Sequence, residues 1–198
     1  MKPRWRTLVF ILLLFGAGAG AYNLGVFFRP PPELSGTAFE TPLPVGNAPL
    51  MHPTLGEMSL EDFQGDTVLL FFGYTRCPDV CPFTLARLAK VYRELDDPAE
   101  VKVVMVTIDP GHDTPEITQR YVESFHPDFI GLSGGNAQVA EVAKTFFIGS
   151  SQLPDGLYTH TDMVVVVDSK GFMRRVYGQD RVPHLSEDLP VLLAGRDW

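Results

Sequence analysis

The stretch Thr67-Val-Leu-Leu-Phe-Phe-Gly-Tyr74, which leads into Cys77-Pro-Asp-Val-Cys-Pro82, decides how this chain folds. A continuous apolar run of this length is typical of a strand buried on both faces. Because proline is well tolerated in the first turn of a helix, Pro82 indicates that a helix begins just after the strand. Apolar residues then recur on one helical face, at Leu85, Leu88, Tyr92 and Leu95. The stretch predicts a buried strand, a loop with two cysteines and a helix.

Strands and helices continue to alternate towards the C-terminus. Thr114 is a suitable N-cap for a helix that starts at Pro115, and the turn at 168–171 separates two short strands as in a β-hairpin. The predicted elements are a strand at 101–108, the helix after Thr114, a strand at 129–132, a helix at 137–147, strands at 163–167 and 172–177, and a helix at 184–194. This order predicts an α/β protein with a central mixed sheet flanked by helices. A thioredoxin-like fold fits the order.

Charge is distributed unevenly along the chain. Four basic residues, Lys2, Arg4, Arg6 and Arg29, precede the first acidic residue, Glu33. The rest of the chain has 12 of the 16 Lys and Arg against all 24 Asp and Glu, a formal charge of −12. Such a surface repels nucleic-acid phosphates and tolerates cationic partners or metal ions. The charge therefore argues against a nucleic-acid-binding protein.

The N-terminal part predicts a membrane anchor. Residues 7–28 contain no charged residue and are long enough, as a helix, to cross a hydrocarbon layer of about 30 Å. Three basic residues before the run favour a cytoplasmic N-terminus. The alternative is a signal peptide cleaved near Ala19-Gly-Ala21, where the residues are small. Either interpretation places the following domain outside the cytoplasm.

Three segments follow from this interpretation. Residues 1–28 form the anchor or signal peptide, and residues 50–198 form one globular domain, because a chain of 198 residues falls short of the usual size for two domains. Between them, residues 29–49 contain six prolines, three of them consecutive at Pro30-Pro-Pro32. That composition predicts an extended linker that holds the domain away from the membrane.

Cys77 and Cys81 are the only cysteines. A thiol near a helix N-terminus has a lowered pKa because the helix dipole and the free backbone amides favour the thiolate. Thiolates attack disulfides and bind soft metals. The alternative is a structural disulfide, but a bridge across so short a loop stabilises a fold little. The placement favours a reactive pair of thiols.

The stretch Phe71-Phe-Gly-Tyr-Thr-Arg-Cys-Pro-Asp-Val-Cys-Pro82 resembles the signature of the Sco/SenC family of copper chaperones for cytochrome c oxidase assembly. Three further stretches resemble the same family and occur in the same order. They are Thr107-Ile-Asp-Pro-Gly-His-Asp-Thr-Pro115, His160-Thr161 and Tyr177-Gly178. Together the similar stretches extend over about residues 58–177, and their combination is far more specific than one Cys-x-x-x-Cys motif.

The resemblance implies that Cys77, Cys81 and His160 bind copper, as Cu(I) or Cu(II). Two soft thiolates with one imidazole are a ligand set that suits this metal. The resemblance further implies a metallochaperone, rather than an enzyme, that assembles the binuclear copper (CuA) centre of cytochrome c oxidase. Its partners are then the copper-bearing oxidase subunit and other copper chaperones or thiol reductants.

Two alternative functions use the same cysteines. In a thiol-disulfide oxidoreductase, Cys77 and Cys81 would be a redox-active pair that reduces the cysteines of the oxidase copper site, and His160 would not be needed for electron exchange. In a peroxidase, one cysteine would attack peroxide. No proline-threonine-cysteine arrangement precedes Cys77, which argues against the peroxidase. Three residues between the cysteines, where redox motifs have two, favour metal binding.

The chain departs from the family pattern beside the histidine. The family commonly has an acidic residue immediately before it, and this chain has Thr159. Asp162 could replace that carboxylate if the strand that follows His160 has already begun, because alternate residues then share a face. The resemblance implies no further role for the Asp162 carboxylate.

Other polar residues near the motifs have simpler expected roles. Asp79 is expected to form a local turn hydrogen bond, and Asp109 and Asp113 are expected to form a turn and cap a helix. Arg76 could favour the Cys77 thiolate through its charge. The sequence alone does not assign these residues to the copper site.

Overall fold

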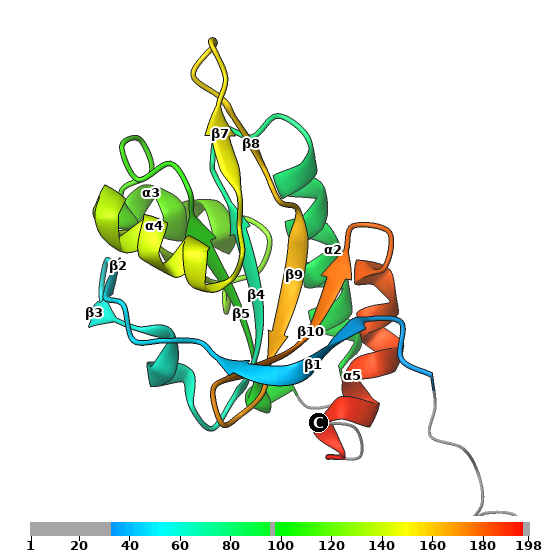
Figure 1. The fold of residues 1–198 in the computed structure, drawn as a ribbon. Coiled ribbons are helices and arrows are strands. Elements are labelled where there is room, and N and C mark those ends of the chain that lie inside the picture. The colour runs from blue at the N-terminus through cyan, green and yellow to red at the C-terminus, as the bar shows by residue number, and fades with distance from the viewer. Residues whose placement is uncertain (1–32, 96–97, 196–198) are drawn as a thin grey trace, which may run out of the picture. The chain divides into compact units, whose positions relative to one another are not determined.

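The computed structural model describes residues 33–95 and 98–195. Its centre is a six-stranded mixed sheet in the order β1-β10-β9-β4-β5-β6 (Figure 1). The strands are β1 (Thr37–Pro44), β4 (Thr67–Gly73), β5 (Val101–Thr107), β6 (Ile130–Leu132), β9 (Met163–Val167) and β10 (Phe172–Gly178). Strands β4, β5 and β6 run parallel to one another, whereas β9 is antiparallel to β4 and β10. This mixed sheet confirms the predicted fold class.

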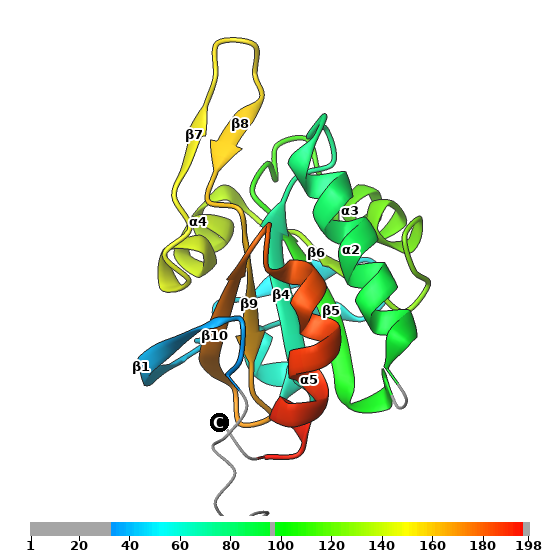
Figure 2. The same cartoon turned by 90° about the vertical axis from the view of Figure 1, so that its right-hand side faces the viewer.

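Helices cover both faces of the sheet. Helices α2 (Val80–Glu94) and α5 (Leu185–Leu193) lie on one face, and α3 (Pro115–Glu123) and α4 (Asn136–Thr145) lie on the other (Figures 1 and 2). All seven residues of β4 are buried, which explains its uninterrupted apolar sequence. Short 3-10 helices lie at Leu60–Phe63, Pro98–Glu100 and Val182–His184. The cysteine motif therefore follows the most deeply buried strand of the domain.

Local signals in the sequence are confirmed where they depend on neighbouring residues. Thr114 caps α3, because its Oγ1 accepts a hydrogen bond from the Ile117 backbone amide. Strands β9 and β10 form the predicted hairpin, with Gly171 at a φ of 81° in its turn. Each predicted helix also forms, with bounds that differ by a few residues from the sequence-based ranges.

The linker prediction needs a correction. Residues 37–44 pair with β10 as the antiparallel edge strand β1, so the compact unit begins at Leu34. Pro42 and Pro44 are compatible with this role because an edge strand has one row of amides without partners in the sheet. The pairing also shifts register between Ala38 and Leu43. A proline-rich composition thus concealed a strand that is stabilised by its neighbour.

The predicted anchor at 1–28 lies outside the described residues. Across residues 33–95 and 98–195, no helix is long and apolar enough to cross a membrane. The anchor stays a prediction from the sequence.

Two small hairpins were not predicted. Strands β2 (Leu50–His52) and β3 (Gly56–Met58) form one of them, and β7 (Ser150–Gln152) and β8 (Tyr158–His160) form the other. The β7–β8 hairpin is short, polar and largely exposed, so its sequence carries little periodic apolar signal. Figure 2 shows it projecting beyond the end of the sheet at which α2 begins. It brings His160 to the cysteine loop.

Candidate metal centre

The two cysteines lie where β4 passes into α2. Cys77 is in the loop and Cys81 is in the first turn of α2. Both residues are buried: Cys77 is 8% exposed and Cys81 is 0% exposed. The Cys81 backbone amide donates a hydrogen bond of 3.4 Å to Cys77 Sγ. Asp79 is the N-cap residue of α2, but its side chain makes no capping hydrogen bond, contrary to the expected local turn bond. The sulfur of Cys77 therefore accepts a hydrogen bond from one of the free backbone amides at the start of the helix.

Burial changes the expected chemistry of Cys81. Desolvation in the core, followed by the hydrogen bond and charge of Cys77, raises the pKa of Cys81 far above its ordinary value. The helix N-terminus was expected to lower thiol pKa values here, and for Cys81 burial outweighs that effect. Without a metal, Cys81 keeps its proton at neutral pH.

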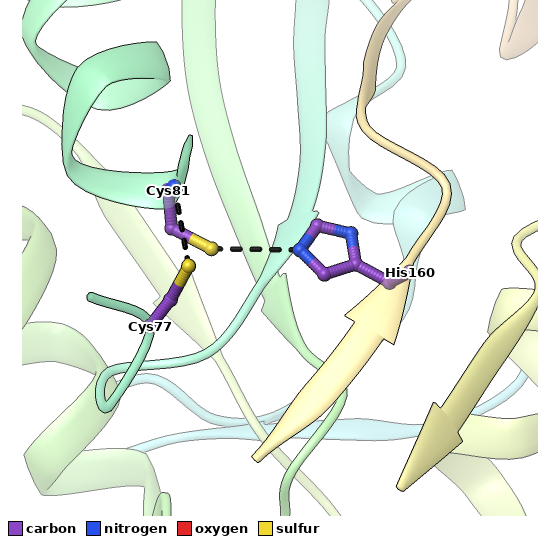
Figure 3. Close-up of side chains that lie close together, drawn as sticks. All are labelled: Cys77, Cys81 and His160. Atoms are coloured by element: carbon purple, nitrogen blue, oxygen red, sulfur yellow. Dashed lines mark hydrogen bonds between the residues drawn. The ribbon is translucent and has the colours of Figure 1, made fainter. Parts of the chain in front are cut away.

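His160 faces the cysteines from the end of β8 (Figure 3). Its Nε2 lies 3.5 Å from Cys81 Sγ, and its Nδ1 lies 2.9 Å from the Thr161 carbonyl oxygen. Because a carbonyl only accepts hydrogen bonds, Nδ1 carries the proton of the neutral ring and Nε2 is left with a lone pair. The Cys81 thiol can then donate to Nε2. The same lone pair is the one a metal would use.

The three side chains form one potential ligand group. Cys77 Sγ, Cys81 Sγ and a His160 ring nitrogen all lie within 4.8 Å of one another. Two sulfurs and one imidazole nitrogen suit Cu(I). The Thr161 carbonyl fixes the orientation of the His160 ring, as do the groups that hydrogen-bond to the second ring nitrogen of metal-bound histidines. Aromatic rings surround the imidazole, with ring-centre distances of 6.3 Å to Phe71 and 6.1 Å to Tyr74. The residues present could hold a soft metal ion.

His160 is reached from the surface. A hollow of about 250 Å³ lies beside it, lined by Gly149, Ser150, Ser151 and Thr159. Thr159 faces the other strand of the hairpin, where its Oγ1 donates to the Ser151 carbonyl oxygen over 3.4 Å. The hydroxyl of Thr159 thus serves the hairpin and does not replace the acidic residue common in the family.

Asp162 lies in the connection between β8 and β9, so strand alternation does not relate it to His160. Burial raises the pKa of its carboxyl group, while Gln179, His160, Thr84 and Arg87 partly offset the rise. The strand that follows His160 begins only at Met163, so the condition under which Asp162 was expected to replace the acidic residue of the family is not met.

Asp113 organises the cysteine loop. This fully buried carboxylate accepts hydrogen bonds from the Thr75 amide at 2.9 Å, the Thr75 hydroxyl at 2.6 Å and the Thr107 hydroxyl at 2.7 Å. His112 Nδ1 donates to it as well. Thr114, and not Asp113, caps the following helix. The sequence showed no signal for this role, because Thr75 and Asp113 meet only when β4 and β5 pair.

Asp109 is also committed to the loop. It accepts hydrogen bonds from Nε and Nη2 of Arg76, which compensates the positive charge beside Cys77. Asp109, His112 and Asp113 have ligand atoms close enough to hold a metal ion. Their carboxylates, however, already accept hydrogen bonds from Arg76, Thr75 and Thr107. This acidic group is better explained as support for the cysteine loop.

A comparison with protein families decides the classification. The family model described as SCO1/SenC matches residues 50–189, which is more than half of the chain. The chain belongs to the SCO1/SenC family. The human mitochondrial SCO2 homologue is 35% identical over 128 residues, covering 61% of this chain and 48% of its own length. This chain therefore matches about half of that relative.

Solved structures agree in fold. Apo Sco1 from Thermus thermophilus is 38% identical with a TM-score of 0.72, covering 82% of this chain and 96% of its own. ScoI from Bradyrhizobium japonicum, determined with copper bound, is 32% identical with a TM-score of 0.67, covering 75% of this chain and 98% of its own. Both structures share the fold over most of this chain.

Proposed function

We propose that this chain is a copper metallochaperone that holds copper through Cys77, Cys81 and His160. The observation that carries the proposal is the convergence of two sulfurs and one imidazole nitrogen within 4.8 Å, from a loop, a helix and a hairpin. Two thiolates and an imidazole match the preference of Cu(I) and can also hold Cu(II). Copper in a Bradyrhizobium relative of 32% identity supports the choice of metal.

The recipient is proposed from the family. The Sco/SenC resemblance implies delivery of copper to the CuA centre on the copper-bearing subunit of cytochrome c oxidase. The hollow beside His160 gives a partner access to one ligand without unfolding of the core. Release of copper would require the partner to replace the three ligands in turn, and the exposed histidine side is the accessible place to begin.

A second function uses the same sulfurs. Cys77 and Cys81 lie close enough for a disulfide to form between them, which would pass two electrons and two protons to a disulfide on the oxidase subunit. Reduction of the CuA cysteines would prepare that centre for copper. This oxidoreductase would need both thiols but would not need His160.

The test is copper binding by the reduced full chain beside His160→Ala. We expect one copper per chain and more than about 100-fold weaker binding by the variant, because a lost ligand should exceed the loss typical of outer partners. His184→Ala, a histidine exposed at the start of α5, is the matched control and should bind like the wild type. Unchanged binding by His160→Ala would refute the three-residue site.

The same variant separates the two functions. Thiol-disulfide exchange depends on the thiolate, the leaving group and access, so His160→Ala should keep most of its rate with a model disulfide. In cells, failed assembly of the oxidase copper centre supports the chaperone. Normal assembly supports the reductase.

The location is proposed from the sequence. Residues 7–28 would anchor the chain in a membrane with the domain on the extracytoplasmic side. A reporter that is active only in the cytoplasm, fused after Trp198, should give no signal. A strong signal would overturn this topology.

A further inference from the structure

The β7–β8 hairpin has few connections to the rest of the domain. Within residues 33–95 and 98–195, its strands pair with each other and with no further strand, and all three residues of β7 are exposed. Its base is closed by two hydrogen bonds between Gly149 and Thr161. Neither bond reaches the cysteine loop. The position of His160 over the sulfurs must therefore depend on other contacts.

Tyr74 provides the first such contact. Its hydroxyl donates to the Tyr158 carbonyl oxygen over 3.0 Å and accepts from the Tyr158 amide over 3.2 Å. The two rings also pack edge to face, with a centre distance of 5.8 Å. Tyr74 is only 2% exposed and directly follows the buried strand β4, while Tyr158 is two residues before His160. One buried side chain thus fixes the backbone of β8.

Arg76 provides the second contact. Its Nη2 donates to the Gly156 carbonyl oxygen over 3.2 Å, in the loop of the hairpin. The same guanidinium is held by Asp109, which lies two residues after the end of β5. A planar guanidinium can bind a carboxylate and a carbonyl at once because its donors have a fixed geometry. Arg76 therefore joins the hairpin loop to the body of the domain.

The residues before Cys77 divide between two tasks. The side chain of Thr75 bonds to Asp113 and holds the cysteine loop, whereas Tyr74 and Arg76, on either side of it, bond to the hairpin. A four-residue segment, 74–77, thus supplies one sulfur and two side chains that hydrogen-bond to the hairpin. Any shift of the segment would move the sulfur and the hairpin contacts together.

We propose that Tyr74 and Arg76 form a latch that seats the β7–β8 hairpin and keeps His160 Nε2 within reach of the two sulfurs. They act as positioning residues, because neither supplies a ligand in the proposed site. The latch rests on the proposed copper function. Outer partners that orient a metal-bound histidine typically change affinity by about 10–100-fold, and the latch should act in this range.

The test is Cu(I) affinity of the reduced full chain carrying Tyr74→Phe. This variant keeps the ring that packs beside His160 and removes only the hydroxyl, so we expect about tenfold weaker binding or more. The matched control is Tyr177→Phe, which removes a buried hydroxyl that bonds to Asp188 away from the site. It should keep wild-type copper affinity. Equal affinity of Tyr74→Phe and wild type would overturn the proposal.

A double-mutant cycle identifies the route of the effect. Tyr74 could also act on the sulfurs directly. Burial is the main cause of the raised pKa of the Tyr74 hydroxyl, and Cys77 raises this pKa further. If Tyr74 acts through His160, Tyr74→Phe should cause no further loss of copper in a His160→Ala background. A full loss in that background would show a direct effect on the sulfurs and refute the latch.

Two further measurements complete the test. The electron paramagnetic resonance spectrum of the Cu(II) form should show weakened nitrogen coupling in Tyr74→Phe but not in Tyr177→Phe. Arg76→Lys keeps the charge and loses the planar donors, so it should weaken binding several-fold, and an unchanged affinity would remove Arg76 from the latch.

If His160→Ala itself binds copper normally, the proposed function fails. If His160→Ala loses copper and Tyr74→Phe does not, only the latch fails.

Discussion

The two sides of the candidate metal centre are built very differently. The sulfurs belong to the core: Cys81 is fully buried at the start of α2, and Asp113 ties the loop of Cys77 to β5. The imidazole belongs to an exposed hairpin that bonds to the body of the domain through Tyr74 and Arg76. The difference teaches that the fold holds the two proposed sulfur ligands, whereas a few local contacts hold the proposed histidine ligand. Such an arrangement suits the proposed delivery of copper to a partner.

Oxidation should have the largest effect, because it removes the cysteine side of the site completely. A Cys77–Cys81 disulfide offers no thiolate, so oxidised protein should retain no copper and reduction should restore one copper per chain. Metal analysis after desalting of the two forms measures this. Equal copper in both forms would place the site elsewhere and contradict the comparison between the cysteine side and the histidine side.

Removal of the Asp113 carboxylate tests whether the cysteine side depends on the core. Asp113→Ala leaves the Thr75 amide and the Thr107 hydroxyl without their buried acceptor, so it should lower the free energy of unfolding by about 3 kcal/mol or more. Asp155→Ala, which removes an exposed acceptor within the hairpin, should change it by less than about 0.5 kcal/mol. Chemical denaturation of both variants checks the contrast. Similar losses would mean that the hairpin is as integrated as the loop.

The pH dependence of copper binding should report the buried sulfur. Since burial holds the pKa of Cys81 far above neutrality, copper must displace a proton from this thiol throughout the neutral range. Apparent affinity should therefore rise with pH, by about tenfold or more from pH 7 to pH 8. Competition with a Cu(I) chelator at the two pH values measures the change. An affinity independent of pH would show that Cys81 does not lose a proton to the metal.

The smallest effect is expected for Phe147, which lies between α4 and the hairpin. Phe147 follows the C-cap residue of α4, has a φ of 58° and is 65% exposed, a position where glycine is preferred. Phe147→Gly should raise the free energy of unfolding by about 1 kcal/mol. Its neighbour Phe146 is buried against Phe72, so Phe146→Ala should lower it by about 3–5 kcal/mol. A loss of stability in Phe147→Gly would show that this exposed ring packs against the hairpin.

Much of the cysteine side could be predicted from the sequence. The apolar run at 67–74, Pro82 and the helical repeat after it depend on neighbouring residues, and the structure places β4 and α2 there. The Thr114 cap and the β9–β10 turn are local in the same sense. Such elements are visible because their hydrogen bonds and periodic burial repeat within a few residues.

The histidine side depends on contacts between distant residues. His160 is 79 residues from Cys81, and only the family resemblance selected it among the five histidines. Strand β1 was concealed because its partner β10 lies more than a hundred residues later. No local pattern contains such pairings, since a residue's own sequence neighbours say nothing of what it meets across the sheet.

The sequence by itself determined where the two cysteine sulfurs lie and which strand and helix hold them. Only the tertiary structure decided their chemistry and support. Packing of α2 on the sheet buries Cys81 and raises its pKa, pairing of β4 with β5 brings Asp113 to Thr75, and Tyr74 meets the hairpin through Tyr158. The physical reason is that desolvation and hydrogen-bond geometry are set by atoms that approach in space, and the chain brings those atoms together only when it folds.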